Sequence, residues 1–163
     1  EAIYDEHADA LYTFLLSRLR DPDVVRDVLQ DVFWKLARKS DPLAGIDNQR
    51  SYLIRLAHNQ SIDHCRRRET WTDYHELFAR EPARIFASTE DPDETAFCHA
   101  VEEALAGLPE NQRTVVHLKL RQSMTFDQIA HTLDIPPNTA ASRYRYGIDK
   151  LRDALRPLYA EII

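Results

Sequence analysis

The chain has 163 residues, a formal net charge of −6, 44% hydrophobic and 29% charged residues, and only three glycines. This composition is typical of a globular protein and argues against a loop-rich β protein. No apolar run approaches the ~18 residues of a membrane span and no secretory signal is present, so no membrane insertion is expected. The two cysteines, Cys65 and Cys98, form no disulfide framework, which favours a cytoplasmic protein with free thiols.

Three amphipathic helices are predicted in the first 68 residues. The first covers about residues 3–20, the second begins near Asp23, and the third spans about residues 49–68 after a loop over residues 40–48. The inward positions expected from helical spacing are Tyr4, Ala8, Leu11, Tyr12, Leu15 and Leu19 in the first helix, Val25, Val28, Leu29, Val32, Phe33 and Leu36 in the second, and Leu53, Leu56 and Ala57 in the third. Three such helices can bury a small core.

Residues 69–93 are predicted to form an acidic linker. From residue 69 to residue 94 the chain carries eight acids against two arginines. Its apolar residues leave open a short docked helix, and the alternative is a solubilising acidic spacer. A further helix is expected over about residues 94–106, ending at Gly107, with inward positions Phe97, Val101, Ala104 and Leu105. Strand signals are absent, so the predicted fold class is all-α, with two small helical domains at residues 1–68 and 94–163.

The stretch 109–156 contains a helix-turn-helix pattern. Thr125 and Gln128 have the spacing of a capping box, which predicts the start of the first helix. Residues 134–137 include two prolines and end that helix, because proline lacks an N–H and restricts the residue before it. The second helix is expected from about residue 138 to residue 155, with Pro137 in its first turn.

The second helix of this motif carries side chains suited to DNA. Small polar, aromatic and cationic groups can meet phosphates and base edges in a major groove. The side chains concerned are Thr139, Ser142, Arg143, Arg145, Tyr146 and Lys150. An ordinary helical hairpin in an all-α core is the alternative that the local pattern leaves open.

Residues 104–155 resemble the C-terminal, −35-reading domain of bacterial extracytoplasmic-function (ECF) sigma factors. The resemblance rests on Leu108-Pro109, Arg113, Ile129-Ala130, Leu133, Ile135-Pro136, Thr139, Ser142-Arg143 and Leu151-Arg152. The chain departs from the family pattern at Asn138, Ala140 and Ala141. Ala141 stands where the family frequently has a basic residue, so Arg145 is expected to recover a base contact.

Two further segments resemble the N-terminal, −10-reading domain of the same family. DVLQDVF at residues 27–33 resembles the segment whose polar face docks on the clamp helices of RNA polymerase, which implies polymerase contacts by Asp27, Gln30 and Asp31. SYLIRLAHNQSIDHCRRR at residues 51–68 resembles the segment that holds an unstacked base, together with the loop over residues 40–48. The −10 contacts implied are Tyr52, Asn59, Asp63, Arg66 and Arg67.

These assignments have structural alternatives. The polar face of residues 27–33 is also consistent with a solvated helix face, and Arg66 and Arg67 with a C-terminal cap that interacts with the helix dipole. Tyr52 adjoins the inward Leu53, so its ring packs in the core or stacks on a base.

The sequence thus predicts a transcription initiation factor that directs RNA polymerase to promoters and aids opening of the −10 region. The resemblance implies core RNA polymerase, promoter DNA and an anti-sigma factor as partners. No phosphate-binding loop or catalytic triad is present, so no enzyme activity and no cofactor are expected. No metal site is expected either, because His64-Cys65 and Cys98-His99 would have to meet across the linker.

Two rival functions remain: a stand-alone helix-turn-helix regulator, and a sigma-mimicking interaction protein that titrates a regulator. Phosphate contacts supply most non-specific DNA affinity, so a net charge of −6 favours a protein that depends on a partner over a stand-alone regulator.

Overall fold

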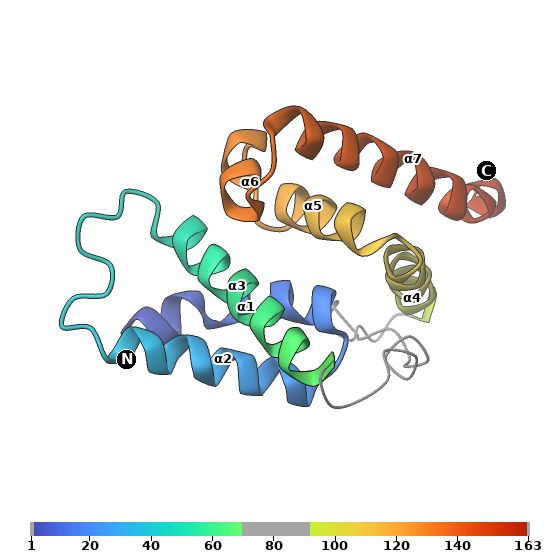
Figure 1. The fold of residues 1–163 in the computed structure, drawn as a ribbon. Coiled ribbons are helices and arrows are strands. Elements are labelled where there is room, and N and C mark those ends of the chain that lie inside the picture. The colour runs from blue at the N-terminus through green and yellow to red at the C-terminus, as the bar shows by residue number, and fades with distance from the viewer. Residues whose placement is uncertain (1, 70–91, 163) are drawn as a thin grey trace.

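The computed structural model describes residues 2–69 and 92–162, and within these ranges the chain folds into helices without strands (Figure 1). The helices are α1 (Ala2–Leu19), α2 (Pro22–Ala37), α3 (Gln49–Glu69), α4 (Pro92–Ala106), α5 (Glu110–Leu120), α6 (Phe126–Leu133) and α7 (Pro137–Ile162). The all-α fold class is therefore confirmed. The expected linker and its apolar residues lie almost entirely outside the described residues.

Helices α1–α3 pack around one another and form the first half of the molecule. The tight connection from α1 to α2 depends on Asp21, whose side chain accepts hydrogen bonds from the N–H groups of Asp23 and Val24 at 3.1 and 3.4 Å. Pro22 occupies the first turn of α2, where its missing N–H costs nothing. The predicted apolar stripe of α2 is confirmed, with Val25, Val28, Val32 and Leu36 buried.

One inward position predicted for α1 is wrong. Tyr4 is 55% exposed, because it lies one turn before His7, where the buried face of the helix begins. Its ring packs on Phe33 of α2, with ring centroids 4.8 Å apart. The buried face of α1 is made by Leu11, Phe14, Leu15 and Leu16.

Local signals for the helix-turn-helix are confirmed in α6 and α7. Thr125 Oγ1 accepts from the N–H of Gln128, and Gln128 Oε1 accepts from the N–H of Thr125, which closes the predicted capping box. Asp134 adopts the left-handed conformation, with φ of 56°, and ends α6. Pro137 then begins α7, as its position after the break predicts.

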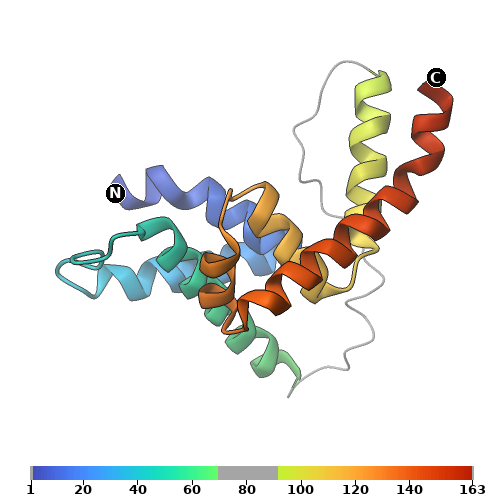
Figure 2. The ribbon, with the colours of Figure 1, turned by 90° about the horizontal axis from the view of Figure 1, so that it is seen from above.

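Helix α7 is longer than predicted. It continues past residue 155 and through Pro157 to Ile162, although proline removes a helical N–H donor. Helix α4 lies alongside the C-terminal part of α7 (Figure 2). Packing between the two helices compensates for the backbone hydrogen bond that Pro157 cannot donate. Phe97 of α4 is 41% exposed, although α4 packs against α7, so its predicted inward position is wrong.

Helices α5 and α7 approach closely at Gly147. A Cβ atom at this position would lie 2.7 Å from Cγ2 of Val116, nearer than real Cβ contacts allow. Glycine is therefore needed there to seat α7 on α5.

The two halves of the molecule share one hydrophobic core. Helix α1 packs against α5, and α3 packs against α6. At the centre, Phe14 is fully buried, with its ring centroid 6.4 Å from that of His58 and 5.9 Å from that of His117. Val115 and Ile129 of the second half belong to the same cluster as Leu11 and Leu53 of the first.

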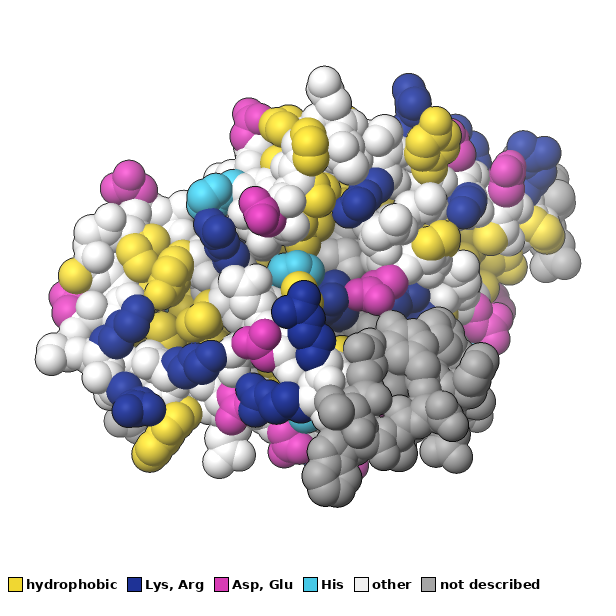
Figure 3. All heavy atoms as spheres, in the orientation of Figure 1, with side chains coloured by type: hydrophobic (Ala, Val, Ile, Leu, Met, Phe, Trp, Pro, Cys, Tyr) yellow, Lys and Arg dark blue, Asp and Glu magenta, His cyan; other side chains and the backbone are white. Residues whose placement is uncertain are grey.

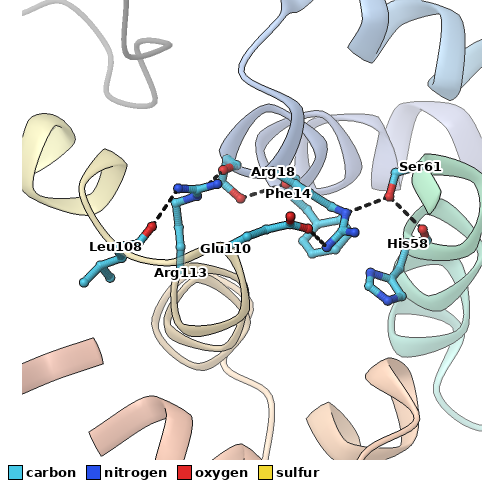
Figure 4. Close-up of polar contacts among 8 residues, drawn as sticks. Phe14, Arg18, His58, Ser61, Leu108, Glu110 and Arg113 are labelled. Carbon is cyan, nitrogen blue, oxygen red and sulfur yellow. Dashed lines mark hydrogen bonds and ion pairs between the residues drawn. The ribbon is translucent and has the colours of Figure 1, made fainter. Parts of the chain in front are cut away.

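Polar contacts also join the halves (Figure 4). The guanidinium of Arg18 on α1 pairs with Glu110 of α5 at 2.8 Å and donates to Ser61 of α3 at 2.8 Å. Arg113 of α5 donates to the backbone carbonyl of Ser17 at 2.8 Å. The relative position of the halves is therefore set by directional bonds as well as by apolar packing.

Burial of His117 predicts acid sensitivity. Burial, together with the charge of Arg121, lowers the pKa of His117 to about 3. The imidazole is neutral in the folded chain but protonates near pH 6.5 when unfolded, so its contribution to stability is lost as the pH falls below 6.5. We expect the free energy of unfolding to fall by about 2 kcal/mol between pH 7 and pH 5 on account of this one group.

Urea unfolding of His117→Gln at both pH values checks this prediction. The variant should lose that share of the pH dependence, whereas His99→Gln, at an exposed position of α4, should keep it. A variant at position 117 with the full wild-type slope would contradict the assignment.

Candidate DNA and polymerase contact surfaces

The predicted −35 residues on the first turns of α7 differ in how far they point away from the packed side of the helix. Ala140 and Gly147 are buried and face α5 and α6. At about 100° per residue, Arg145 and Tyr146 then point away from the molecule, and Ser142, which is half-buried, lies between them around the helix axis. Arg145 and Tyr146 are exposed and adjoin each other, with the guanidinium carbon 5.2 Å from the ring centroid.

Thr139 and Arg143 lie on the flank of α7 and are half-buried. Arg143 lines a cavity of about 440 Å³ together with Arg18, His58 and Glu110. Its side chain therefore faces the first half of the molecule. Burial, together with the charge of Arg18, lowers the pKa of His58 to about 4, so its imidazole is neutral at pH 7. The structure thus separates Arg143 from Arg145.

The predicted −10 residues form one stripe along α3. Tyr52, Asn59, Asp63 and Arg66 follow at intervals of seven, four and three residues, and Arg67 adjoins them, which places all five on one side of the helix. The last four are exposed. Tyr52 is half-buried and packs against the core, and its hydroxyl accepts from Lys39 at 3.4 Å. The core packing weighed as an alternative for this ring is therefore present.

The loop before α3 meets the helix-turn-helix. Tyr52 and Asn48 line a second cavity of about 440 Å³ whose opposite wall includes Asp127 and His131 of α6. Arg55 of α3 donates to Nε2 of His131 at 2.8 Å. The predicted base-binding region of the first half is therefore bordered by α6.

The predicted polymerase residues lie on the outer side of α2. Asp27 and Gln30 are exposed and Asp31 is half-buried, opposite the buried valines. Figure 3 shows Lys and Arg side chains interspersed with acidic ones on this face of the molecule, without one continuous basic surface. Trp34, which was not among the predicted contacts, lies seven residues after Asp27 on the same stripe and is 67% exposed. Its helical register was the signal that could have found it.

Other site types find little support in the described residues. Within residues 2–69 and 92–162 no group of three or more His, Cys, Asp or Glu side chains is arranged to hold a metal, and both cysteines are free and half-buried. None of the helices in these ranges is long and apolar enough to cross a membrane.

The comparisons with known proteins agree with this architecture. Residues 3–71 match the family described as Sigma-70 region 2, and residues 104–153 match Sigma-70, region 4. The first match spans α1–α3, and the second spans α5, α6 and most of α7.

Relatives and a solved structure resemble nearly the whole chain. The chain is 27% identical to the ECF RNA polymerase sigma factor SigK of Mycobacterium sp. (strain KMS), over 94% of the chain and 81% of the relative. It is 24% identical to the ECF RNA polymerase sigma factor SigX of Bacillus subtilis (strain 168), over 100% and 87%. The fold matches the sigma factor RpoE, solved in complex with the anti-sigma factor NepR from Bartonella quintana, with a TM-score of 0.68, 23% identity and 90% of each chain covered.

The chain therefore belongs to the sigma-70 family, in its extracytoplasmic-function group.

Proposed function

We propose that this chain is a transcription initiation factor, not an enzyme, that binds core RNA polymerase in the cytoplasm and directs it to promoters. The observation that carries the proposal is that both sigma-70 regions occur in one chain. In this proposal residues 1–68 form the domain that binds polymerase and the −10 element, residues 69–93 form the linker, and residues 94–163 form the domain that binds the −35 element. An anti-sigma factor is proposed as a further partner, which the structural similarity to RpoE, solved with NepR, supports.

The α3 stripe has the chemistry that promoter opening needs. Separating a duplex costs unpairing and unstacking, and a protein that captures an extruded base offsets part of that cost. The exposed amide of Asn59 can both donate to and accept from a base edge. Arg66 and Arg67, about two turns further along α3, can follow the backbone of the single strand.

Recovery of polymerase on the immobilised chain, followed by run-off transcription, separates this proposal from its rivals. A sigma factor should bind core polymerase and produce promoter-specific transcripts. A stand-alone regulator should bind duplex DNA tightly without polymerase. A sigma-mimicking interaction protein should produce neither transcripts nor specific DNA binding.

We predict that the acidic residues on α2 contact polymerase. The double variant Asp27→Lys, Asp31→Lys should weaken holoenzyme formation at least about tenfold, equivalent to 1.4 kcal/mol. Its stability should change little, because substitutions at exposed and half-exposed helix positions usually cost under about 0.5 kcal/mol. The measurements are polymerase affinity and thermal unfolding.

A matched double reversal, Asp5→Lys with Asp9→Lys, changes the net charge equally at exposed positions of α1. It should leave polymerase affinity close to wild type. Equal loss in both double variants would indicate a general charge effect and contradict a specific α2 contact.

We predict that Arg143 and Arg145 act differently at the −35 element. Arg145 points outward, and arginine can bond guanine with two hydrogen bonds, so Arg145→Ala should relax preference at one position at a cost of about 1–3 kcal/mol. Arg143 lies on the flank and is assigned a phosphate contact, so Arg143→Ala should weaken all promoters alike. Transcription from a library randomised at −35 measures both effects.

Arg152→Ala provides the control, since Arg152 lies further along α7 and pairs with Asp149 at 3.3 Å. Its sequence preference should match wild type. An unchanged preference for Arg145→Ala would mean that −35 recognition depends on Ser142, Tyr146 or DNA shape instead.

A further inference from the structure

Trp34 is the most exposed of the large hydrophobic residues that the structure describes, at 67%. Single exposed apolar residues are common on protein surfaces, so exposure alone carries no function. The position of Trp34 is more specific. On α2 it lies within about 60° of Asp27, Gln30 and Asp31, at the C-terminal end of an otherwise polar stripe.

Folding of the described residues gives no reason for an indole here. Trp34 belongs to neither hydrophobic cluster, whereas its neighbour Phe33 packs against the core and contacts Tyr4. The apolar side of α2 is already complete, with Val25, Val28 and Val32 at 1% exposure or less. An indole placed in water on the opposite side of the helix therefore adds nothing to this packing.

We infer that Trp34 is the apolar anchor of the α2 surface for core RNA polymerase, seated in a pocket of the partner next to Asp27, Gln30 and Asp31. This inference rests on the proposed function and adds to it a residue and its role. Protein interfaces concentrate their binding energy in a few buried aromatic residues, and polar groups around them exclude water and set orientation.

Charge argues for this partner over the other possible occupants. Asp23, Asp27 and Asp31 repeat along the stripe that holds Trp34, where Asp23 pairs with Arg26 at 2.9 Å and the exposed Arg38 follows at the C-terminal end. The segment from residue 69 to residue 94 is itself strongly acidic, and a second copy of the chain would present the same acids. Either occupant places acids against Asp27 and Asp31, which is unfavourable, and would be attracted only at the C-terminal end of the stripe, by Arg38. A polymerase surface with an apolar pocket between cationic groups is complementary.

The anchor and the acids should act on different rate constants. Peripheral charges steer association and respond to salt, whereas desolvated anchors mainly slow dissociation. We expect Trp34→Ala to raise the dissociation rate from polymerase at least tenfold, with little change in the association rate or its salt dependence. Asp27→Asn with Asp31→Asn should instead lower the association rate and flatten its salt dependence.

Two controls accompany these kinetics. Phe97→Ala removes an exposed aromatic residue on α4, and its dissociation rate should equal that of wild type. Trp34→Phe should restore part of the lost residence time, because it retains an aromatic ring. Thermal unfolding should be the same for Trp34→Ala and wild type.

A spectroscopic measurement tests the pocket directly. The chain contains two tryptophans, Trp34 and Trp71, so Trp71→Phe labelled with 7-azatryptophan places one probe at position 34. This probe can be excited apart from the tryptophans of polymerase. We expect solvent-exposed emission in the free chain, and a blue shift with reduced acrylamide quenching in the holoenzyme.

The outcomes distinguish this inference from the proposed function. Absence of polymerase binding by the wild-type chain would overturn both. Wild-type binding with an unchanged dissociation rate in Trp34→Ala would overturn the anchor alone. A probe already shielded from quencher in the free chain would also overturn it. Sedimentation equilibrium would then show whether the free chain is a dimer, in which a second copy covers Trp34, or a monomer, in which its own linker does.

Discussion

The arrangement of this molecule depends on a buried arginine that joins segments far apart in sequence. Arg113 is 8% exposed, and its guanidinium donates to the carbonyl oxygens of Ser17 and Leu108 at 2.8 and 3.0 Å, and to that of Ala106 at 3.3 Å. Burial and the nearby charge of Arg20 lower its pKa to about 10, so it remains protonated at neutral pH. A buried charge requires hydrogen-bonded partners. The hydrogen bond from Arg113 to Ser17, which helps to meet this requirement, holds the end of α1 against the start of α5.

This constraint brings the two sigma regions together and decides which surfaces remain open. With α5 fixed on α1, α6 lies against α3 and borders the cavity beside Tyr52. The flank of α7 that carries Arg143 faces the first half, while Arg145 and Tyr146 remain outside. The outer side of α2 takes part in neither the α1–α5 contact nor the α3–α6 contact. The surfaces assigned to polymerase and to bases at −35 are thus accessible in the same arrangement, whereas the region assigned to −10 bases is partly enclosed.

Sequence reasoning succeeded where the signal was local. The capping box at Thr125 and the prolines at the start of α7 predicted the helix-turn-helix, since caps and breaks depend on neighbours a few residues away. Periodicity placed the site residues on helix faces. Periodicity did not predict which helices those faces pack against. Contacts between residues about a hundred positions apart leave no periodic pattern, as in the pairs Arg113 with Ser17 and Phe14 with His117. Tyr4 was misplaced for a related reason, because a helical stripe does not show where the packing partner stops.

Gly147 has a mechanical consequence for the length of α7. The helix has 26 residues, roughly 39 Å, and leaves no room for a side chain between itself and Val116 of α5 at this glycine, with Thr139 and Ser142 on a short arm before it and the part beside α4 on a long arm after it (Figure 2). Such a helix is a lever with its fulcrum at Gly147. A small displacement of the long arm against α4 then moves the start of the helix in the opposite direction and leaves Arg145 and Tyr146, next to Gly147, nearly in place. The pitch at which the second helix of the motif enters a groove is thus coupled to the seating of α4, far from any base.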